Sequence, residues 1–198
     1  MARNTQPVLK RCRTLGVSPA VMGYSRTSNK NPGGQRRAKK SEYATLLTEK
    51  QKVKFVYGIQ EKQFHAYYEK ASKMAGNTGE ELLCMIERRL DNVVYRLGFA
   101  STRREARQLV NHGHFTVNGK RVNIPSYLVK TGDVVAVCEK SCSNAFFKKL
   151  KEDDVFAAAP KWLDRDKNTL TGKVIAAPAR EDIDFEIAEH LIVELYSK

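Results

Sequence analysis

The sequence contains no run of 18 apolar residues, because charged side chains interrupt every hydrophobic stretch within about ten positions. This absence excludes a helix that crosses a membrane. No apolar stretch follows the basic N-terminus, so we expect no secretory signal. Cysteine is scarce as well, and four residues are too few for a disulfide framework: Cys12, Cys84, Cys138 and Cys142. These absences predict a reduced, cytoplasmic chain.

Acidic residues are scarce at the start of the chain. The formal net charge is +13, and residues 1–54 hold 13 lysines and arginines against 2 acidic residues, whereas residues 151–198 hold 7 against 11. The first 41 residues also lack periodic apolar positions, so they bury too little apolar surface to offset their ordering entropy. Counterion release from a polyanion would supply that free energy. The charge therefore predicts a nucleic acid partner in preference to an anionic membrane.

Apolar residues at helical spacing predict helices over residues 49–57, 60–75, 78–97 and 102–111. Possible N-terminal capping boxes are Thr48 with Gln51, Thr78 with Glu81, and Ser101 or Thr102 with Glu105. After His114 the period changes to 2, and Asn118-Gly119 predicts a type I′ hairpin. Further expected elements are strands at 127–129 and 133–138, a helix at 144–151, a hairpin from 162–164 and 171–177, and a C-terminal helix at 186–196.

Three arginines lie near the start of the helix at 102–111. We expect Arg103 and Arg107 to share an exposed face with Arg104 beside them, while Ala106, Leu109 and Val110 pack inward. The following hairpin brings Lys120 and Arg121 to the surface. Guanidinium groups pair bidentately with phosphate oxygens, so this pattern favours an RNA backbone over the alternative of an ordinary solvated helix face.

The segment RLDNVVYRLGFASTRREARQLVNHGHFTVNGKRVNIPSYLVKTGDVV, residues 89–135, resembles the S4 RNA-binding domain. The opening MARNTQPV, residues 41–71, NTGEELL at 77–83 and the closing EHLIVELYSK are similar to the bacterial-type small-subunit ribosomal protein S4 family (uS4). The resemblance extends over almost the whole chain and is weakest at residues 13–40 and 143–185.

This resemblance implies an α+β fold. It comprises a basic extended N-terminal arm (1–41), a helical domain closed by the C-terminal tail (42–87 and 178–198), and an inserted S4 (αL-type) RNA-binding domain with a small antiparallel sheet and a hairpin extension (88–177). It also implies a structural component of the small ribosomal subunit in the cytoplasm. Such a protein binds the 5′ domain of the small-subunit rRNA, nucleates assembly and contributes to decoding accuracy with ribosomal protein S5. Ribosomal protein S3 and messenger RNA near the entry channel of the small subunit are further expected partners, and a small-molecule substrate is not expected.

The residues expected to contact RNA are basic side chains and one asparagine: Arg3, Lys10, Arg11, Arg13, Arg36, Arg37, Lys39, Lys40, Lys50, Lys52, Lys54, Arg103, Arg104, Arg107, Asn111, Lys120 and Arg121. The resemblance implies that those from Arg36 to Lys40, Lys50 to Lys54 and Arg103 to Arg107 contact a five-helix junction of the rRNA. The acidic segment 151–198 is expected to face a protein neighbour.

Many members of this family hold zinc in the arm through a CxxC pair and a second cysteine pair. Here Leu9 stands at the first of these positions, only Cys12 remains, and no cysteine lies between residues 13 and 83. A structural zinc site needs four ligands, so we expect an arm without metal and a chain without cofactors. Cys138 and Cys142 near His112 and His114 have an unusual spacing for zinc.

Two other classes of protein remain as alternatives. Arg89-Leu90-Asp91 resembles the RLD motif of pseudouridine synthases, but there the aspartate follows the S4 domain within a catalytic domain about as large as this whole chain. Here Asp91 comes before the arginine-rich helix and the hairpin of that domain, on a predicted helix with no catalytic domain around it, so we expect a surface carboxylate paired with neighbouring arginines and no catalytic residue. The second alternative is a free-standing RNA-binding regulator or assembly factor built on the same S4 domain.

Overall fold

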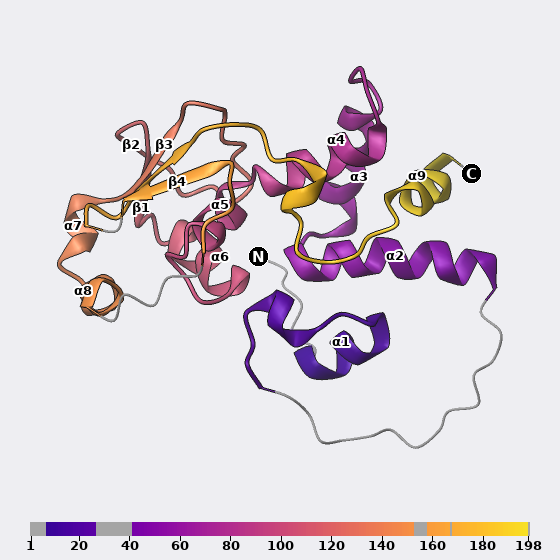
Figure 1. Cartoon of the computed structure of the whole chain (residues 1–198), viewed down its shortest axis with the longest axis horizontal. Coiled ribbons are helices and arrows are strands. Elements are labelled where there is room, and N and C mark those ends of the chain that lie inside the picture. The colour runs from indigo at the N-terminus through magenta and orange to yellow at the C-terminus, as the bar shows by residue number, and fades with distance from the viewer. Residues whose placement is uncertain (1–6, 27–40, 153–157, 167, 198) are drawn as a thin grey trace. The chain divides into compact units, whose positions relative to one another are not determined.

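A computed structural model of the chain describes residues 7–26, 41–152, 158–166 and 168–197 (Figure 1). The chain divides into two compact units. Unit 1 comprises residues 1–82 and 183–198, and unit 2 comprises residues 83–182. No helix in the described ranges is long and apolar enough to cross a membrane.

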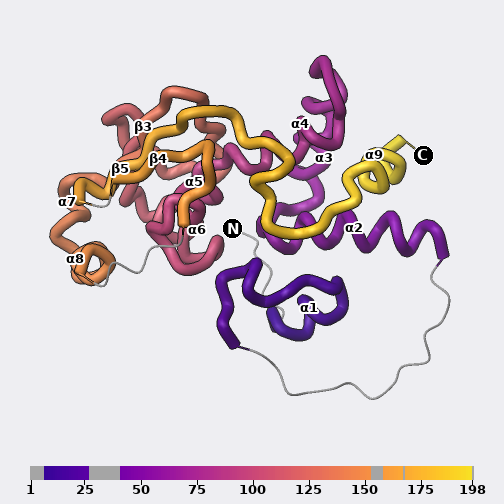
Figure 2. Tube along the Cα trace, viewed as in Figure 1, coloured from indigo at the N-terminus to yellow at the C-terminus, as the bar shows by residue number. Residues whose placement is uncertain are grey.

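Unit 1 is helical, and the C-terminal segment returns to complete it (Figure 2). Its helices are α1 (Val8–Leu15), the 3-10 helix η1 (Pro19–Met22), α2 (Glu42–Tyr57), α3 (Glu61–Ala71), the first half of α4 (Thr78–Glu87), and α9 (Glu189–Ser197). The most extensive packing between helices of this unit joins α2 to α9. Val53 of α2, Phe64 of α3 and Ile192 of α9 are fully buried.

Helix α2 begins earlier than the sequence predicts. The Ser41 hydroxyl caps it by accepting a hydrogen bond from the Ala44 amide at 3.2 Å, and Gly58 ends it in the left-handed conformation. The expected capping box at Thr48 is wrong. Thr48 lies inside the helix, where its hydroxyl donates to the Ala44 carbonyl at 2.6 Å.

Residues 8–15 are helical, whereas the sequence predicts an extended arm. Apolar side chains explain the difference, because the helix brings Cys12 and Leu15 onto one side, where both are buried, and Met22 of η1 is buried as well. The rest of the predicted arm, residues 1–6 and 27–40, lies outside the described residues.

Unit 2 combines helices with an antiparallel sheet, which confirms the expected α+β class. Its helices are α5 (Leu90–Arg96), α6 (Arg103–Asn111), α7 (Glu139–Cys142), α8 (Ala145–Glu152) and the 3-10 helix η2 (Arg180–Asp182). The strands are β1 (Phe115–Val117), β2 (Lys120–Arg121), β3 (Val134–Val137), β4 (Leu163–Asp166) and β5 (Thr171–Val174), in the order β2-β1-β3-β5-β4.

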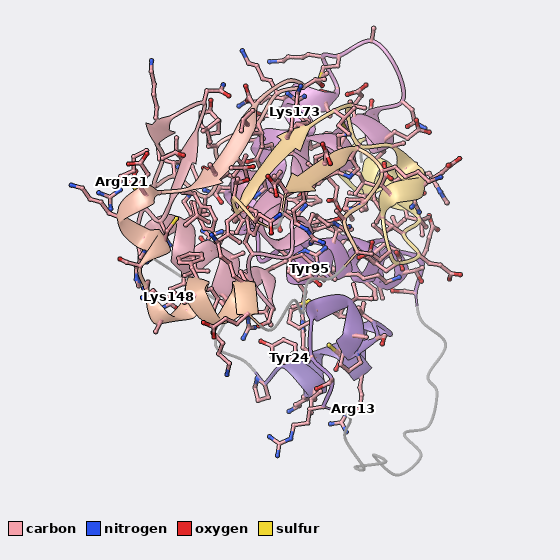
Figure 3. All side chains as sticks on the ribbon, turned by 60° about the vertical axis from the view of Figure 1, so that its left-hand side comes forward. Arg13, Tyr24, Tyr95, Arg121, Lys148 and Lys173 are labelled. Carbon is pink, nitrogen blue, oxygen red and sulfur yellow. The ribbon has the colours of Figure 1, made fainter. Side chains whose placement is uncertain are left out.

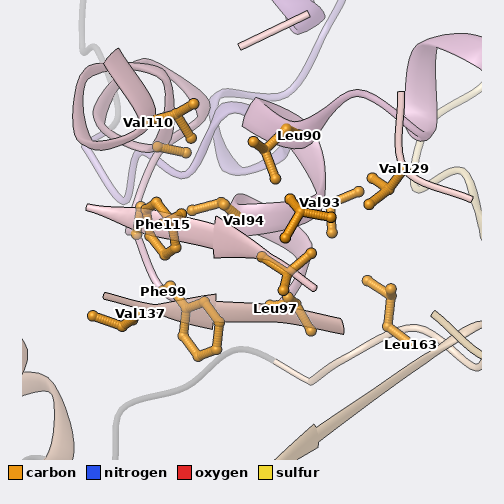
Figure 4. Packing of buried hydrophobic residues seen from close by; sticks show 14 of the residues in the cluster. Leu90, Val93, Val94, Leu97, Phe99, Val110, Phe115, Val129, Val137 and Leu163 are labelled. Atoms are coloured by element: carbon orange, nitrogen blue, oxygen red, sulfur yellow. The ribbon is translucent and has the colours of Figure 1, made fainter. Parts of the chain in front are cut away.

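The core of unit 2 lies between the sheet and helices α5 and α6 (Figure 4). Leu90 and Val94 of α5, with Leu97 directly after that helix, meet Val110 of α6 and Phe115 of β1 in one cluster of buried residues. The short strands are thus held by a packed interior, which a two-stranded hairpin alone would lack.

Several local predictions in unit 2 are confirmed. Asn118 and Gly119 have φ angles of +50° and +78°, as the I′ hairpin between β1 and β2 requires. The second hairpin forms from β4 and β5, and the predicted short helix appears as α8. In unit 1, the predicted C-terminal helix appears as α9.

The prediction of one helix from Thr78 to Leu97 is wrong, because the helix is interrupted at residues 88 and 89, between α4 and α5. Arg89 adopts an extended conformation, with φ −65° and ψ 138°, and forms a bridge with Leu128. The Leu90 amide donates to the Tyr127 carbonyl at 2.8 Å, and the Val129 amide donates to the Arg88 carbonyl at 3.0 Å. Residues 127–129, predicted as a strand, therefore pair with the break itself.

Candidate nucleic-acid interface

Helix α6 starts with the predicted cap. The Thr102 hydroxyl accepts a hydrogen bond from the Glu105 amide at 3.2 Å, and the Glu105 carboxylate accepts one from the Ser101 amide at 2.7 Å. The side chains that α6 exposes are Arg104, Gln108 and Asn111, with half-buried Arg107 at their border. We call these four residues the α6 face. They are polar or basic, so the surface suits phosphate and sugar contacts.

Arg103 does not belong to the α6 face, which corrects the expected exposed set of three arginines. Its exposed fraction is 6 %, its Nε donates to Asn92 Oδ1 at 2.8 Å, and its guanidinium lies 4.3 Å from the ring centroid of Tyr95. The reason is helical spacing, because Arg103 precedes buried Ala106 by three positions and buried Val110 by seven.

A network of buried polar side chains lies between the α4–α5 break and α6. Glu87 accepts two hydrogen bonds from the Arg96 guanidinium, at 2.8 and 3.1 Å, and a third from the Asn92 amide group at 2.5 Å. Asn92 in turn accepts from Arg103. The buried charges of Glu87 and Arg96 are paired, as burial in an apolar interior requires, and the bond from Arg103 to Asn92 attaches the first turn of α6 to α5.

Asp91 belongs to a second part of this network. It pairs bidentately with Arg89, at 3.0 and 2.7 Å, and its Oδ2 also accepts from Arg107 Nη1 at 3.2 Å. The predicted pairing with arginines is confirmed, but the predicted surface position is wrong, because Asp91 is 4 % exposed. The extended conformation at Arg89 turns this carboxylate under α6 instead of towards solvent.

The hairpin after α6 places further basic groups beside the end of that helix. Lys120 and Arg121 are exposed, and the Arg121 guanidinium donates to the carbonyls of Gly113 at 2.8 Å and His112 at 3.1 Å. Gly113 has a φ of +71°, and a Cβ at this position would lie 2.5 Å from Arg121 Nε. A glycine is therefore needed here for Arg121 to hold the carbonyls at the end of α6.

His114 lies in a positive environment next to this hairpin. Its Nδ1 is 2.9 Å from the Ser141 hydroxyl. Burial, followed by the positive charges of His112 and Arg121, lowers the pKa of His114 below its usual 6.5. The ring is thus predominantly neutral at pH 7, and His114 adds a hydrogen-bonding group rather than a charge to this edge.

The predicted lysines of α2 are engaged within unit 1. Lys50 and Lys54 both donate to the Glu61 carboxylate, at 2.8 and 2.5 Å, and Lys52 donates to Glu49 at 2.6 Å. Burial of Glu61 opposes its ionisation, but hydrogen bonds from Lys50, Lys54 and Tyr196 outweigh this effect and lower its pKa to about 2. Their expected contact with RNA stays a prediction, since these ammonium groups also serve the fold.

The remaining predicted residues lie at the start of the chain. Lys10 and Arg13 of α1 are exposed, and Arg11 is half-buried with its guanidinium 3.4 Å from the Gln51 side-chain oxygen. Five predicted residues lie outside the described ranges: Arg3, Arg36, Arg37, Lys39 and Lys40.

Other exposed basic residues of unit 2 are absent from the predicted set. They lie on α7, α8 and β5 and in the segments before β3 and β4: Lys130, Lys140, Lys148, Lys149, Lys151, Lys161 and Lys173. Figure 3 shows Arg121 of β2 and Lys148 of α8 pointing outwards at the same edge. Residues 55–150 hold 15 lysines and arginines against 9 acidic residues, and this excess is the sequence feature that could have predicted the additional residues within this range. Gln108 was overlooked because it carries no charge.

The described residues contain no group of three or more His, Cys, Asp or Glu side chains arranged to hold a metal ion. All four cysteines are free thiols, and Cys12 is buried in unit 1. The α6 face and the β1–β2 hairpin expose guanidinium, ammonium and amide groups, which bind phosphate, sugar and base edges.

Comparison with known proteins covers the whole chain. Residues 3–87 match the family model described as ribosomal protein S4/S9 N-terminal domain, and residues 88–135 match the S4 domain. The Small ribosomal subunit protein uS4 of Fusobacterium nucleatum is 52 % identical over 198 residues, which cover all of both chains. The proteins of the same name from Caldicellulosiruptor bescii and Caldicellulosiruptor saccharolyticus are 62 % and 63 % identical, again over both complete chains. The two family models meet at Arg88, where the structure separates α4 from α5.

Proposed function

Because the chain belongs to the uS4 family of small ribosomal subunit proteins, we propose that it binds the 5′ domain of the small-subunit rRNA and nucleates assembly there. Membership of this family carries a structural role in the small subunit, in the cytoplasm. The observation on which the proposal rests most is the similarity over full length, because both the N-terminal region and the S4 domain match in one chain.

The surface that we assign to the rRNA backbone is the α6 face together with Lys120 and Arg121. Arg104 and Asn111 are exposed on α6, and Arg121 is held against the end of the same helix. Fixed guanidinium groups suit phosphate oxygens, and a rigid helix with a hairpin suits RNA that is read by its shape. Lys10, Arg13 and the basic residues between Arg36 and Lys40 would extend this contact.

We assign residues 88–177 to the inserted S4 RNA-binding domain, and residues 42–87 with 178–198 to the helical domain. In this proposal the protein contributes to decoding accuracy with ribosomal protein S5 and has S3 as a second neighbour. The acidic segment 151–198 would face a protein, because its net charge opposes contact with phosphate.

We further propose that the role is not catalytic. The Asp91 carboxylate, the candidate from the RLD motif, is enclosed by two arginines and a backbone amide. These hydrogen bonds hold the carboxylate in place, which suits a structural role rather than a catalytic one.

Messenger RNA near the entry channel is the remaining proposed partner, and Arg36, Arg37, Lys39 and Lys40 would contact it. Ribosomes with these four residues replaced by alanine should move more slowly through structured messages. Unchanged progress would remove this contact from the proposal.

Sedimentation of cell lysate through a gradient at low salt tests the central proposal. We expect one copy of the chain per small subunit, both in free subunits and in translating ribosomes. A chain found only at the top of the gradient, or only with free subunits, would instead identify the free-standing regulator or assembly factor built on the same domain.

A further inference from the structure

Asp91 lies beneath the α6 face and touches a member of that face from below. Its side chain is 6 % exposed, whereas the side chain of Arg107 is 24 % exposed. The contact joins Asp91 Oδ2 to Arg107 Nη1 at 3.2 Å. Arg107 therefore has one end in the buried network and part of its surface in solvent.

The carboxylate that holds Arg107 is itself held on several sides. Arg89, which is fully buried, pairs with both of its oxygens, and the backbone amide of Asn92 donates to Oδ1 at 3.0 Å. The Asp91 amide donates to the Pro125 carbonyl at 3.2 Å, so the main chain at this point is attached to the loop at 125–128. The carboxylate is thus a rigid support.

A rigid support matters for an arginine because its guanidinium is planar. The hydrogen bond through Nη1 restricts the orientations of that plane and uses one of the five N–H donors. An arginine oriented before binding loses less side-chain freedom when a phosphate arrives than one that must be ordered at that moment.

We propose that Asp91 is a positioning residue for RNA binding, which holds the Arg107 guanidinium ready for a backbone phosphate. This inference rests on the proposed function, because it takes RNA as the ligand of the α6 face. Asp91 touches no RNA and has the same sign of charge as phosphate. It nevertheless increases affinity, through Arg107.

The direction in which RNA affinity changes when Asp91 is replaced distinguishes positioning from simple charge repulsion. Removal of an acidic charge from a protein that binds RNA should tighten binding, because less repulsion remains. If Asp91 acts by positioning Arg107, its removal should weaken binding, by about threefold to tenfold.

The test measures the affinity of the full chain for a transcript of the 5′ domain of small-subunit rRNA at several salt concentrations. Asp91→Asn is compared with Asp164→Asn, which removes an equal charge from an exposed position on β4 of the same unit. We expect Asp91→Asn to bind about threefold to tenfold more weakly, with a salt dependence reduced by about one phosphate contact. We expect Asp164→Asn to bind as tightly as the unchanged chain or tighter.

Comparison with Arg107→Ala distinguishes a positioning role from a merely structural one. If Asp91 acts through Arg107, Asp91→Asn should cause no further loss of affinity in an Arg107→Ala background. An equal loss in both backgrounds would overturn the proposal, and so would tighter binding by Asp91→Asn that matches the Asp164→Asn control.

Should Asp91→Asn fail to fold, Arg107→Lys replaces it as the test. A lysine keeps the charge but lacks the planar fork, so we expect it to bind as weakly as Arg107→Ala. Wild-type affinity in Arg107→Lys would overturn the proposal, because orientation would then be irrelevant. A wild-type chain that does not prefer the 5′-domain transcript over an unrelated folded RNA would instead count against the proposed function.

Discussion

Individual charged residues differ in what they contribute, and the contacts of each one explain the difference. Arg103 and Arg104 are adjacent, yet the first packs against Tyr95 and the second is exposed. Lys50 and Lys54 have the same charge as Arg104 but share the carboxylate of Glu61. Positive charge in the sequence is therefore divided between the fold and the surface.

Glu61→Gln should lower the free energy of unfolding at pH 7. The pKa of Glu61 is lowered to about 2 from 4.5, so its contribution is fully present above pH 4.5 and is lost as the pH falls towards 2. The side chain is 47 % exposed, and solvent screening reduces the effect to about 1 kcal/mol. Urea denaturation should show this gap from the unchanged chain at pH 7, a narrower gap below pH 4.5, and its closure as the pH approaches 2.

Glu69→Gln is the matched control for that measurement. Glu69 is an exposed acid of the same helix, and its carboxylate lies 3.3 Å from His65 Nδ1, one turn away. Such surface pairs contribute a few tenths of a kcal/mol. An equal loss of stability in both variants would contradict the role assigned to Glu61.

At the scale of elements, α5 and the sheet approach closely at one point. Gly172 lies in the middle of β5, and a Cβ built there would lie 2.4 Å from a methyl carbon of Leu97 at the end of α5. Glycine allows the helix to reach the strand, so this position concerns packing and not backbone conformation.

Gly172→Ala should lower the free energy of unfolding by about 1–3 kcal/mol, because the added methyl group overpacks the core. Urea denaturation followed by the fluorescence of Trp162, the single tryptophan, reports on this unit directly. The double variant Gly172→Ala/Leu97→Ala should lose less free energy of unfolding than the sum of the losses in the two single variants, because removal of the Leu97 methyl groups relieves the clash. Strictly additive losses would show that the clash is not the cause.

Elements also show where sequence patterns succeed. Helix α6 and the β1–β2 hairpin have signals within a few residues, namely the Thr102 cap and the Asn118-Gly119 turn, and both were predicted. The break at Arg89 was not, because its hydrogen-bonding partners lie in the loop at 125–128, almost forty residues further along the chain. A local pattern contains no information about that pairing.

At the scale of the whole molecule, charge is distributed unevenly along the chain. Residues 1–54 are strongly basic and residues 151–198 are acidic. Association with RNA is thus expected to depend on the basic part and to be opposed by the acidic part. The two segments suit different kinds of neighbour, one with phosphates and one without.

The affinity of the full chain for 5′-domain rRNA should fall steeply with salt. If about six phosphates are contacted, a rise from 50 to 200 mM salt should weaken binding by about 10³-fold. Filter binding or fluorescence anisotropy over this range measures the slope. An affinity that does not change with salt would mean that the exposed basic residues are not engaged with phosphate.

The sequence by itself determined the family, the α+β class, the uneven charge and the local elements with strong caps or turns. Each of these depends on composition or on residues close together in the chain. Only the tertiary structure decided which basic side chains remain on the surface. Arg103 is buried against α5, and Lys50 and Lys54 pair with a carboxylate on another helix. Such pairings depend on distances between remote segments, which are established only when the chain folds.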